Sequence, residues 1–325
     1  MQKPLHRFDV SLRETRVTLI IAELIFTFAS WAVLVALMFW LENAYAQAAT
    51  VPITALFLIK AFSLQHDAGH RNLFTNRKVN DRVGTLLSLL TLIPYRTWKD
   101  DHAIHHNSFS LTEGNEFGDV HILSTKEYAE LGSFSKLLYR IYRLPIVIIG
   151  IGPLYYLFIR QRWPAIWSRK NAVYHLIFNI YFIAFWAAVI YFAPLATIIT
   201  VFLTYYLYGI IGLSIFFIEH QFEGAQWETD PETWDRTNAS TLGSSVIIFP
   251  RWLEWFTSNI GYHSIHHLDP KIPYHNLREA YLTVEKTMHI STISFKEALG
   301  SFKLSLTDSI NGKLISFKQY EAQQA

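Results

Sequence analysis

Four apolar stretches, each about twenty residues long or longer, restrict what this chain can fold into more than any other feature of its sequence. They cover residues 17–41, 45–64, 172–193 and 195–218. A helix over the first stretch would be roughly 37 Å long, enough to cross a hydrocarbon core of about 30 Å. Charged residues make up only 17% of the chain, against about 25% in soluble domains. We therefore expect an all-α integral membrane protein with four transmembrane helices.

Two further apolar runs are too short or too interrupted to predict a full crossing. Residues 84–94 form the first run, and residues 144–159 form the second, which is interrupted by Gly150, Gly152 and Pro153. Arginines flank both runs on both sides. Basic residues at both ends suit a segment that returns to the side of the membrane from which it entered. We expect both runs to be interfacial or re-entrant.

The distribution of Lys and Arg predicts which side of the membrane each loop occupies. Residues 42–44 and the turn at Pro194 carry no Lys or Arg, whereas the N-terminal tail, residues 65–171 and the region after residue 218 hold nearly all of them. Because positive charges favour the cytoplasmic side, we expect two helical hairpins with both termini in the cytoplasm. Residues 65–171 and 219–325 would form a cytosolic cap on a single membrane-embedded domain. The basic N-terminal tail lacks the apolar core of a signal peptide.

Two local features give expectations of their own. Lys60 lies about one turn from the end of the second apolar stretch, and we expect its side chain to extend along the helix to the interface. Asn311-Gly312 stands between alternating apolar residues, which predicts a small β-hairpin within the otherwise helical cap.

Eight of the 14 histidines fall into three clusters. The clusters are His66 and His70; His102, His105 and His106; and His263, His266 and His267. Residues three and four apart share one face of a helix, so each cluster would direct its imidazoles toward one point. All eight lie outside the four apolar stretches, and His220 leaves the fourth stretch at the same depth. We expect them to converge on one site just below the membrane.

The other histidines have simpler expected roles. Isolated histidines in loops are usually solvated or bonded to one polar neighbour, and we expect this for His6, His121, His275 and His289. His175 lies near the start of the third stretch, where we expect a local hydrogen bond at the interface.

The ligand type limits the metal chemistry. A zinc site takes about four ligands, so eight or nine imidazoles suit two ions with four or five histidines each. Imidazole binds zinc, copper, iron and nickel, and the ligands alone do not select among them. The chain has no cysteine, which excludes thiolate metal sites. Redox chemistry beside lipid tails favours iron and dioxygen.

Asp67 would point about 100° away from His66 on a helix. We expect its carboxylate to accept a ring N–H from a ligand histidine or to make a simple helix-end contact.

The three clusters and their flanks resemble the membrane fatty acid desaturases with three histidine boxes, in particular the bacterial acyl-lipid branch. The pattern HxxxH, HxxHH, HxxHH is present, and the flanking segments "HDAGHRNLF", "NDRVGTLLSLLTLIPYRTWKDDHAIHH", "FFIEHQFE" and "NIGYHSIHHLDPKIPYHNL" are similar to those of that branch. Ala68 stands where Cys is common. Animal relatives use an Asn as a further ligand at the position of Phe216, so that ligand is not carried over.

The resemblance implies an oxygen-dependent desaturase that introduces a cis double bond into an acyl chain, in a bacterial inner membrane. It implies two iron ions, O₂ as co-substrate, and His220 as a ninth ligand beside the eight box histidines. The acyl chain would belong to a membrane phospholipid or another acyl lipid. Electrons would come from an external donor such as a ferredoxin, a flavodoxin or a cytochrome b5-like protein. No nucleic-acid partner is expected.

Five basic residues around the first two boxes are candidates for docking that donor. They are Arg71, Arg77, Lys78, Arg96 and Lys99. The general preference of positive charge for the cytoplasmic side, or contact with lipid phosphates, explains the same residues equally well.

Two alternatives stay open. A fatty acyl, alkane, sphingolipid or carotenoid hydroxylase or ketolase could use the same scaffold and the same histidine boxes. A non-enzymatic metal or haem carrier is a less favoured alternative, because such proteins place their ligands near the membrane midplane, whereas these clusters lie outside the apolar stretches.

Overall fold

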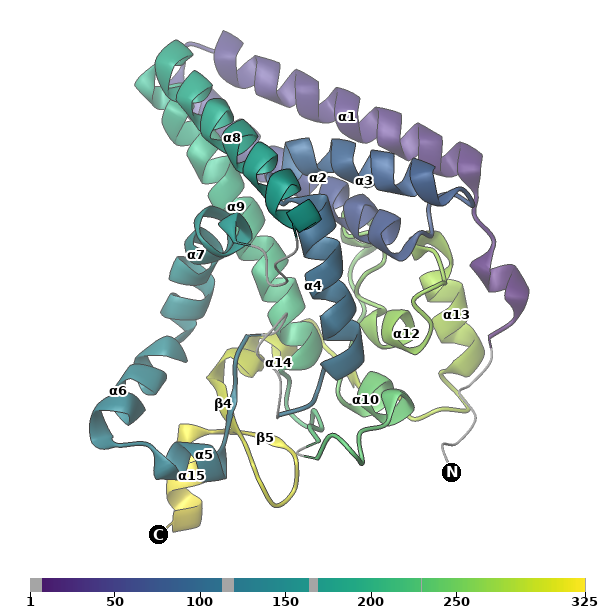
Figure 1. Ribbon diagram of the computed structural model, residues 1–325, viewed down its shortest axis with the longest axis vertical. Helices are drawn as coiled ribbons and strands as arrows, with labels where there is room; N and C mark the ends of the chain where they lie inside the picture. The colour runs from purple at the N-terminus through teal and green to yellow at the C-terminus, as the bar shows by residue number, and fades with distance from the viewer. Residues whose placement is uncertain (1–7, 113–119, 164–168, 229, 325) are drawn as a thin grey trace.

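The computed structural model describes residues 8–112, 120–163, 169–228 and 230–324 (Figure 1). Four helices of this part of the chain are long and apolar enough to cross a membrane. They are α1 (Val17–Trp40), α2 (Ala44–His70), α8 (Arg169–Phe192) and α9 (Leu195–His220). The four long apolar helices expected from the sequence are therefore present. Helices α1, α8 and α9 are close to their predicted bounds, whereas α2 extends six residues beyond residue 64.

Helix α2 is the central helix of the four. It packs against α1, α3 and α9, and most of its apolar stretch is buried. The side chain of Asn43 caps its start by accepting the N–H groups of Tyr45 and Ala46. Helices α1 and α8 instead expose apolar side chains, such as Ile25 and Ile183. This pattern suits helices with one face on the protein and the other on lipid.

The short run at residues 84–94 contributes to α3 (Arg77–Thr91), which lies along α2 in Figure 1. Helix α4 (Tyr95–Ser108) follows after a buried turn. The Tyr95 ring packs directly on Gly84, where any larger side chain would overlap it. The Tyr95 hydroxyl donates to the backbone oxygen of Ala68 at 3.0 Å. These contacts fix the start of α4 against the end of α2, which brings the second histidine box beside the first.

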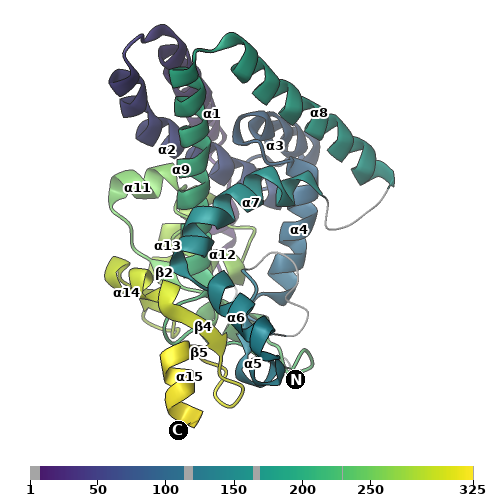
Figure 2. The same cartoon turned by 90° about the vertical axis from the view of Figure 1, so that its left-hand side faces the viewer.

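The run at residues 144–159 forms a bent limb. Helix α6 (Ser133–Tyr142) precedes the run, which contains the π-helix η2 (Ile146–Ile151) and α7 (Gly152–Phe158). The two parts of the limb meet at 62°, and the short 3-10 helix η3 (Arg160–Arg162) ends it. Figure 2 shows the limb leaving α9 and descending toward the C-terminal strands.

The chain also contains β-structure, so the expected all-α fold is only partly correct. Strand β4 (Leu304–Thr307) pairs with β1 (Leu123–Ser124) in parallel and with β5 (Leu314–Ser316) antiparallel. Strands β2 (Val246–Ile247) and β3 (Thr292–Ile293) form a separate parallel pair. The hairpin predicted at Asn311-Gly312 joins β4 to β5, and Gly312 takes the left-handed conformation there, with φ of 64°.

The remaining elements are short. They are η1 (Val10–Arg13), α5 (Thr125–Glu130), α10 (Arg236–Leu242), α11 (Arg251–Phe256), α12 (His263–Leu268), η4 (Tyr274–Asn276), α13 (Leu277–Val284), α14 (Phe295–Gly300), η5 (Ser301–Lys303) and α15 (Phe317–Gln324). Helix α12 packs against α10, α13 and β2. Its position matters most, because it carries the third histidine box.

Lys60 does not extend to the interface, so that expectation is wrong. Its side chain is fully buried, and its Nζ lies 2.6 Å from a carboxylate oxygen of Glu23 on α1. The Nζ also donates to the hydroxyl of Ser258 at 3.1 Å, while the Tyr274 hydroxyl donates to Glu23 at 2.7 Å. A buried charge is tolerated when it is paired and hydrogen-bonded, and Glu23 offers that pairing within the protein.

Replacing Lys60 with methionine should destabilise the protein by about 3–5 kcal/mol, because it leaves the mostly buried Glu23 carboxylate without a counter-charge. The change can be measured as the thermal unfolding temperature of the detergent-solubilised protein. The double variant Glu23→Gln/Lys60→Met removes both charges and should recover most of the loss. Equal stability of Lys60→Met and the parent protein would contradict the pairing.

Candidate metal centre

The nine candidate ligands come from four helices. His66 and His70 lie in the last turn of α2, and His220 is the last residue of α9. The second box lies on α4 and the third on α12. Helix α2 continues without a break through the first box, so His66 and His70 extend the spanning helix rather than follow it. Arg71 ends that helix in the left-handed conformation, with φ of 66°.

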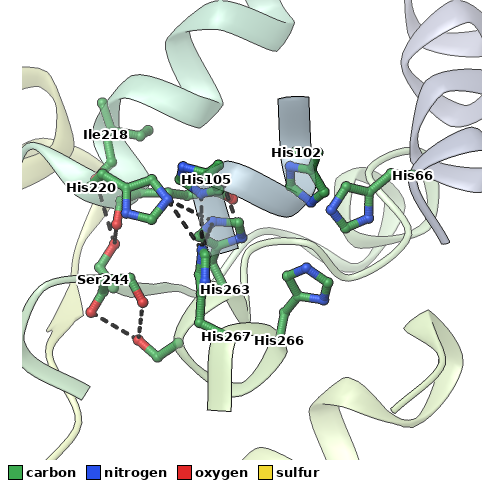
Figure 3. Close-up of polar contacts among 12 residues, drawn as sticks. His66, His102, His105, Ile218, His220, Ser244, His263, His266 and His267 are labelled. Atoms are coloured by element: carbon green, nitrogen blue, oxygen red, sulfur yellow. Dashed lines mark hydrogen bonds and ion pairs between the residues drawn. The ribbon is translucent and has the colours of Figure 1, made fainter. Parts of the chain in front are cut away.

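The nine imidazoles form two adjacent groups. Figure 3 labels seven of them: His66, His102 and His266 of one group, and His105, His220, His263 and His267 of the other. Cage A consists of His66, His70, His102, His106 and His266, and cage B consists of His105, His220, His263 and His267. In each cage the ligand nitrogens lie within 4.8 Å of one another. The nine side chains thus divide into groups of five and four, and His220 belongs to cage B.

The nitrogen contacts fit a cation in each cage. The Nε2 atom of His267 faces the Nε2 atoms of His263, His220 and His105 at 3.0, 3.3 and 3.3 Å. A neutral imidazole nitrogen carries at most one proton, so one atom cannot make three such hydrogen bonds as donor. In cage A the Nε2 atom of His102 likewise faces those of His70 and His106, both at 3.0 Å. Converging lone pairs are the arrangement that a metal ion requires.

Burial favours the neutral, metal-binding form of five of these histidines. Removal from water is the largest cause that lowers their pKa, and neighbouring imidazoles lower it further. The pKa is well below its usual value for His102, His106, His263, His266 and His267. A lowered pKa in these five imidazoles favours the unprotonated nitrogen that a metal ion binds.

Aromatic rings restrain one ligand of each cage. Phe109 is fully buried and stacks on His267, with ring centroids 3.9 Å apart. Trp98 stacks on His102 at 4.7 Å, with the two planes 15° apart. All four ligands of cage B are buried, whereas His70 and His102 of cage A are partly exposed. The solvent-accessible side of the centre is therefore at these two residues.

Each cage also has a buried carboxylate beside it. A carboxylate oxygen of Glu219 lies 3.4 Å from Nδ1 of His263, and both side chains are almost fully buried. A carboxylate oxygen of Asp67 lies 3.8 Å from Nδ1 of His66. The other Asp67 oxygen accepts the Tyr274 N–H at 2.8 Å, which ties the third-box region to α2. Carboxylates in this position orient metal-binding imidazoles and balance the charge of the ion.

Sequence reasoning missed Glu219. The residue directly precedes His220 in the sequence, but its role depends on contact with His263, 44 positions further on in α12. A carboxylate beside a candidate ligand at the end of a spanning helix was the available signal, because ionisable residues at such depth are rarely without a role.

Replacing Glu219 with glutamine should weaken metal binding to cage B by roughly 10- to 100-fold, because an amide then replaces the carboxyl group that lies 3.4 Å from Nδ1 of His263. Cobalt(II) titration of the metal-free protein gives the affinity of each site. The matched control is Asp308→Asn, which changes another buried carboxylate at the β4–β5 turn, where it accepts the Ile310 N–H. Equal cobalt(II) affinities at cage B in the parent protein and in Glu219→Gln would show that Glu219 does not support metal binding there.

Four further described histidines are not members of either cage. His121 and His289 are exposed, and His275 is partly buried with its Nε2 3.3 Å from the backbone oxygen of Glu14. His175 is buried within α8. His6 lies outside the described residues.

The five candidate docking residues lie at the ends of α2, α3 and α4. Four of them, Arg71, Arg77, Lys78 and Arg96, are exposed. Lys99 pairs with Asp81 at 2.8 Å. Arg71 and Lys99 lie close in sequence to His70 and His102, the two partly exposed histidines of cage A.

Candidate membrane spans, together with two adjacent histidine groups that could hold metal ions, indicate a class: helical membrane proteins with a histidine-rich metal site. Comparison with known proteins gives the family. The sequence model of the fatty acid desaturase family matches residues 43–297, and this protein belongs to that family.

Curated relatives agree with the assignment. The chain is 34% identical to a fatty acid desaturase of Bacillus subtilis over 268 residues, which cover 82% of this chain and 76% of the relative. It is 26% identical to the sn-1 oleoyl-lipid 12-desaturase of Anabaena variabilis over 267 residues, which cover 78% and 74%. It is 25% identical to a chloroplastic omega-6 fatty acid desaturase of Glycine max, over 69% of this chain and 53% of the relative.

Proposed function

We propose that this protein is an oxygen-dependent acyl-lipid desaturase that introduces a cis double bond through a di-iron centre. The observation that carries the proposal is the pair of adjacent cages with five and four imidazoles, in a member of the fatty acid desaturase family. When bound there, two iron ions would supply, with O₂ and two electrons, the oxidising power to remove two hydrogens from adjacent CH₂ groups.

The residues of the chain hold, orient and isolate the centre. Imidazoles from α2, α4, α9 and α12 fix the two positions relative to each other, so the reacting bond can be presented at one place. Phe109 and Trp98 limit rotation of His267 and His102. The burial of cage B excludes water from that side, which reduces side reactions.

We infer that the substrate is the acyl chain of a membrane lipid. The relative from Anabaena variabilis is named for an oleoyl lipid, and the candidate spans of this chain give it access to lipid. We further propose that the four spans form two hairpins, that both termini and the cages lie on the cytoplasmic side of a bacterial inner membrane, and that residues 65–171 and 219–325 form the cytosolic cap. The distribution of Lys and Arg supports this orientation.

Product mass tests the reaction. Expression in a host that lacks polyunsaturated lipids, followed by mass analysis of its lipid and acyl-CoA pools, should reveal acyl chains that have lost two hydrogens. The position of the new double bond then follows from fragmentation of the product. Acyl chains that have instead gained one oxygen would identify a hydroxylase on the same scaffold and would overturn the desaturase proposal.

We propose that an external donor protein with an acidic surface, such as a ferredoxin, a flavodoxin or a cytochrome b5-like protein, docks at the five basic residues. Reversing two exposed charges with Arg77→Glu/Lys78→Glu should raise the KM for the donor by about tenfold, because fewer encounters are productive. The substitutions place acidic residues at the start of α3, where a helix tolerates them.

Turnover driven by a small-molecule reductant serves as the internal control and should not change. Lys318→Glu reverses an exposed charge on α15 and is the matched variant. Unchanged donor-dependent kinetics in Arg77→Glu/Lys78→Glu would contradict donor docking at these residues. Their charges would then serve lipid contact or membrane topology.

A further inference from the structure

The limb formed by α6, η2 and α7 carries an exposed apolar stripe. The side chains of Phe134, Leu137, Leu138, Ile141, Leu144 and Ile146 are all exposed, by 44% to 72%. The four on α6 follow the spacing of a single helix face. Six large apolar side chains in a row are more than a soluble surface normally leaves in water.

The opposite face of α6 is fully engaged with the protein. The Tyr139 hydroxyl donates to the backbone oxygen of Ser305 in β4 at 2.6 Å. Arg140 pairs with Glu321 of α15 at 2.7 Å, and buried Arg143 donates to the backbone oxygen of Leu304 at 2.8 Å. Helix α6 therefore presents its polar face to the β4–β5 hairpin and α15, and its apolar face to the outside.

We propose that this stripe lies in the apolar–polar boundary of the lipid bilayer and fastens the C-terminal strands and α15 to the membrane surface. An amphipathic helix with this distribution is typical of an element that lies in the interface plane. The positive charges of α6 are occupied within the protein, so the surface offers apolar contact rather than a site for a charged partner.

Continuity with the membrane-spanning part favours the bilayer over a protein partner. The exposed apolar side chains continue along η2 and α7 with Ile151, Tyr155 and Ile159. Helix α7 is fixed to α9, because Pro153 packs so closely on Gly209 that an added Cβ would lie 2.9 Å from it. Exposed Trp163 ends the limb, a residue type enriched at membrane interfaces. The stripe is therefore continuous with exposed apolar side chains on α7, which packs against the candidate span α9.

The attachment gives the stripe a fixed place relative to cage B. Gly209 lies 11 residues before His220 on α9, a distance of roughly 16 Å along the helix axis. The position of the limb in the bilayer would therefore indicate how far the candidate metal centre lies from the bilayer surface. This holds whichever reaction occurs at that centre.

The absence of cysteine allows the proposal to be tested with single labels. The full-length protein with Leu138→Cys or Ile146→Cys, labelled with bimane, is placed in vesicles of phosphatidylethanolamine and phosphatidylglycerol whose acyl chains are brominated near the headgroup. Both labels should be quenched at least half as strongly as a label at Ile183→Cys on α8, relative to unbrominated vesicles. Ile310→Cys is the matched control: Ile310 is apolar and 91% exposed, but lies at the tip of the β4–β5 hairpin.

Aqueous iodide separates the outcomes. The proposal expects strong bromolipid quenching and weak iodide quenching at residues 138 and 146, and the reverse at residue 310. Strong iodide quenching at residues 138 and 146 would overturn it by placing the stripe in water. Shielding from both quenchers would also overturn it, because a second copy or another protein would then cover the stripe.

Discussion

Replacing His266 with alanine should remove one of two bound metal ions and reduce product formation by more than about 100-fold. His266 is fully buried, and its Nε2 lies 3.1 Å from Nε2 of His106 within cage A. Alanine opens that cage without touching the four nitrogens of cage B. Metal content per chain, measured after loading with ferrous iron under argon, should therefore fall from two ions to one, while the fold is retained.

The control for His266 is His275→Ala. His275 follows the third box closely, but its ring contacts the backbone oxygen of Glu14 instead of either cage, so this variant should keep both ions and most activity. Loss of both ions in His266→Ala, with an unchanged unfolding temperature, would contradict the separation into two cages. Retention of both ions would remove His266 from the ligand set.

Replacing Gly261 with alanine should weaken binding at both cages together. Gly261 pairs with β2, since the Ile247 N–H donates to its backbone oxygen at 2.7 Å. An added Cβ would overlap the Ile247 carbonyl oxygen and lie 2.9 Å from the Phe249 ring. The Ile247 carbonyl belongs to the backbone of β2 and cannot move away at low energetic cost. The segment that leads into α12 must therefore shift instead. Because α12 supplies His266 to cage A and His263 and His267 to cage B, displacement of a few tenths of an ångström affects both centres.

The expected result for Gly261→Ala is an affinity for cobalt(II) lower by on the order of tenfold at each site, together with destabilisation of about 1–3 kcal/mol from overpacking. Gly300→Ala is the matched control, because an added Cβ meets nothing within 4 Å there. A selective loss at one cage, or no loss at either, would show that the close approach of Gly261 to β2 does not position α12.

The convergence of the histidines could be predicted because each box is recognisable from the spacing of residues close together in the sequence. The spacing within each box is the spacing of a helix face, and α4 and α12 do present their boxes in that way. The division of nine ligands between two cages follows from their number and from the ligand count of a metal ion. Which histidine belongs to which cage depends on how four helices pack together. The spacing of histidines along the sequence does not predict that packing.

Other features depend on contacts between distant segments. Lys60 and Glu23 pair across two helices, and a lysine near a helix end gives no sign of such a partner. Strands of two residues, such as β2 and β3, are too short to produce an alternating pattern. The amphipathic character of α6 is visible in the sequence, but the face that the protein covers is set by β4 and α15.

Iron content is the most direct test of the central claim that two histidine cages hold a di-iron centre. The full-length protein, purified without chelators and loaded with ferrous iron in the absence of oxygen, should bind two iron ions per chain. Binding of a single ion, or retention of zinc in both cages with exclusion of iron, would contradict the account.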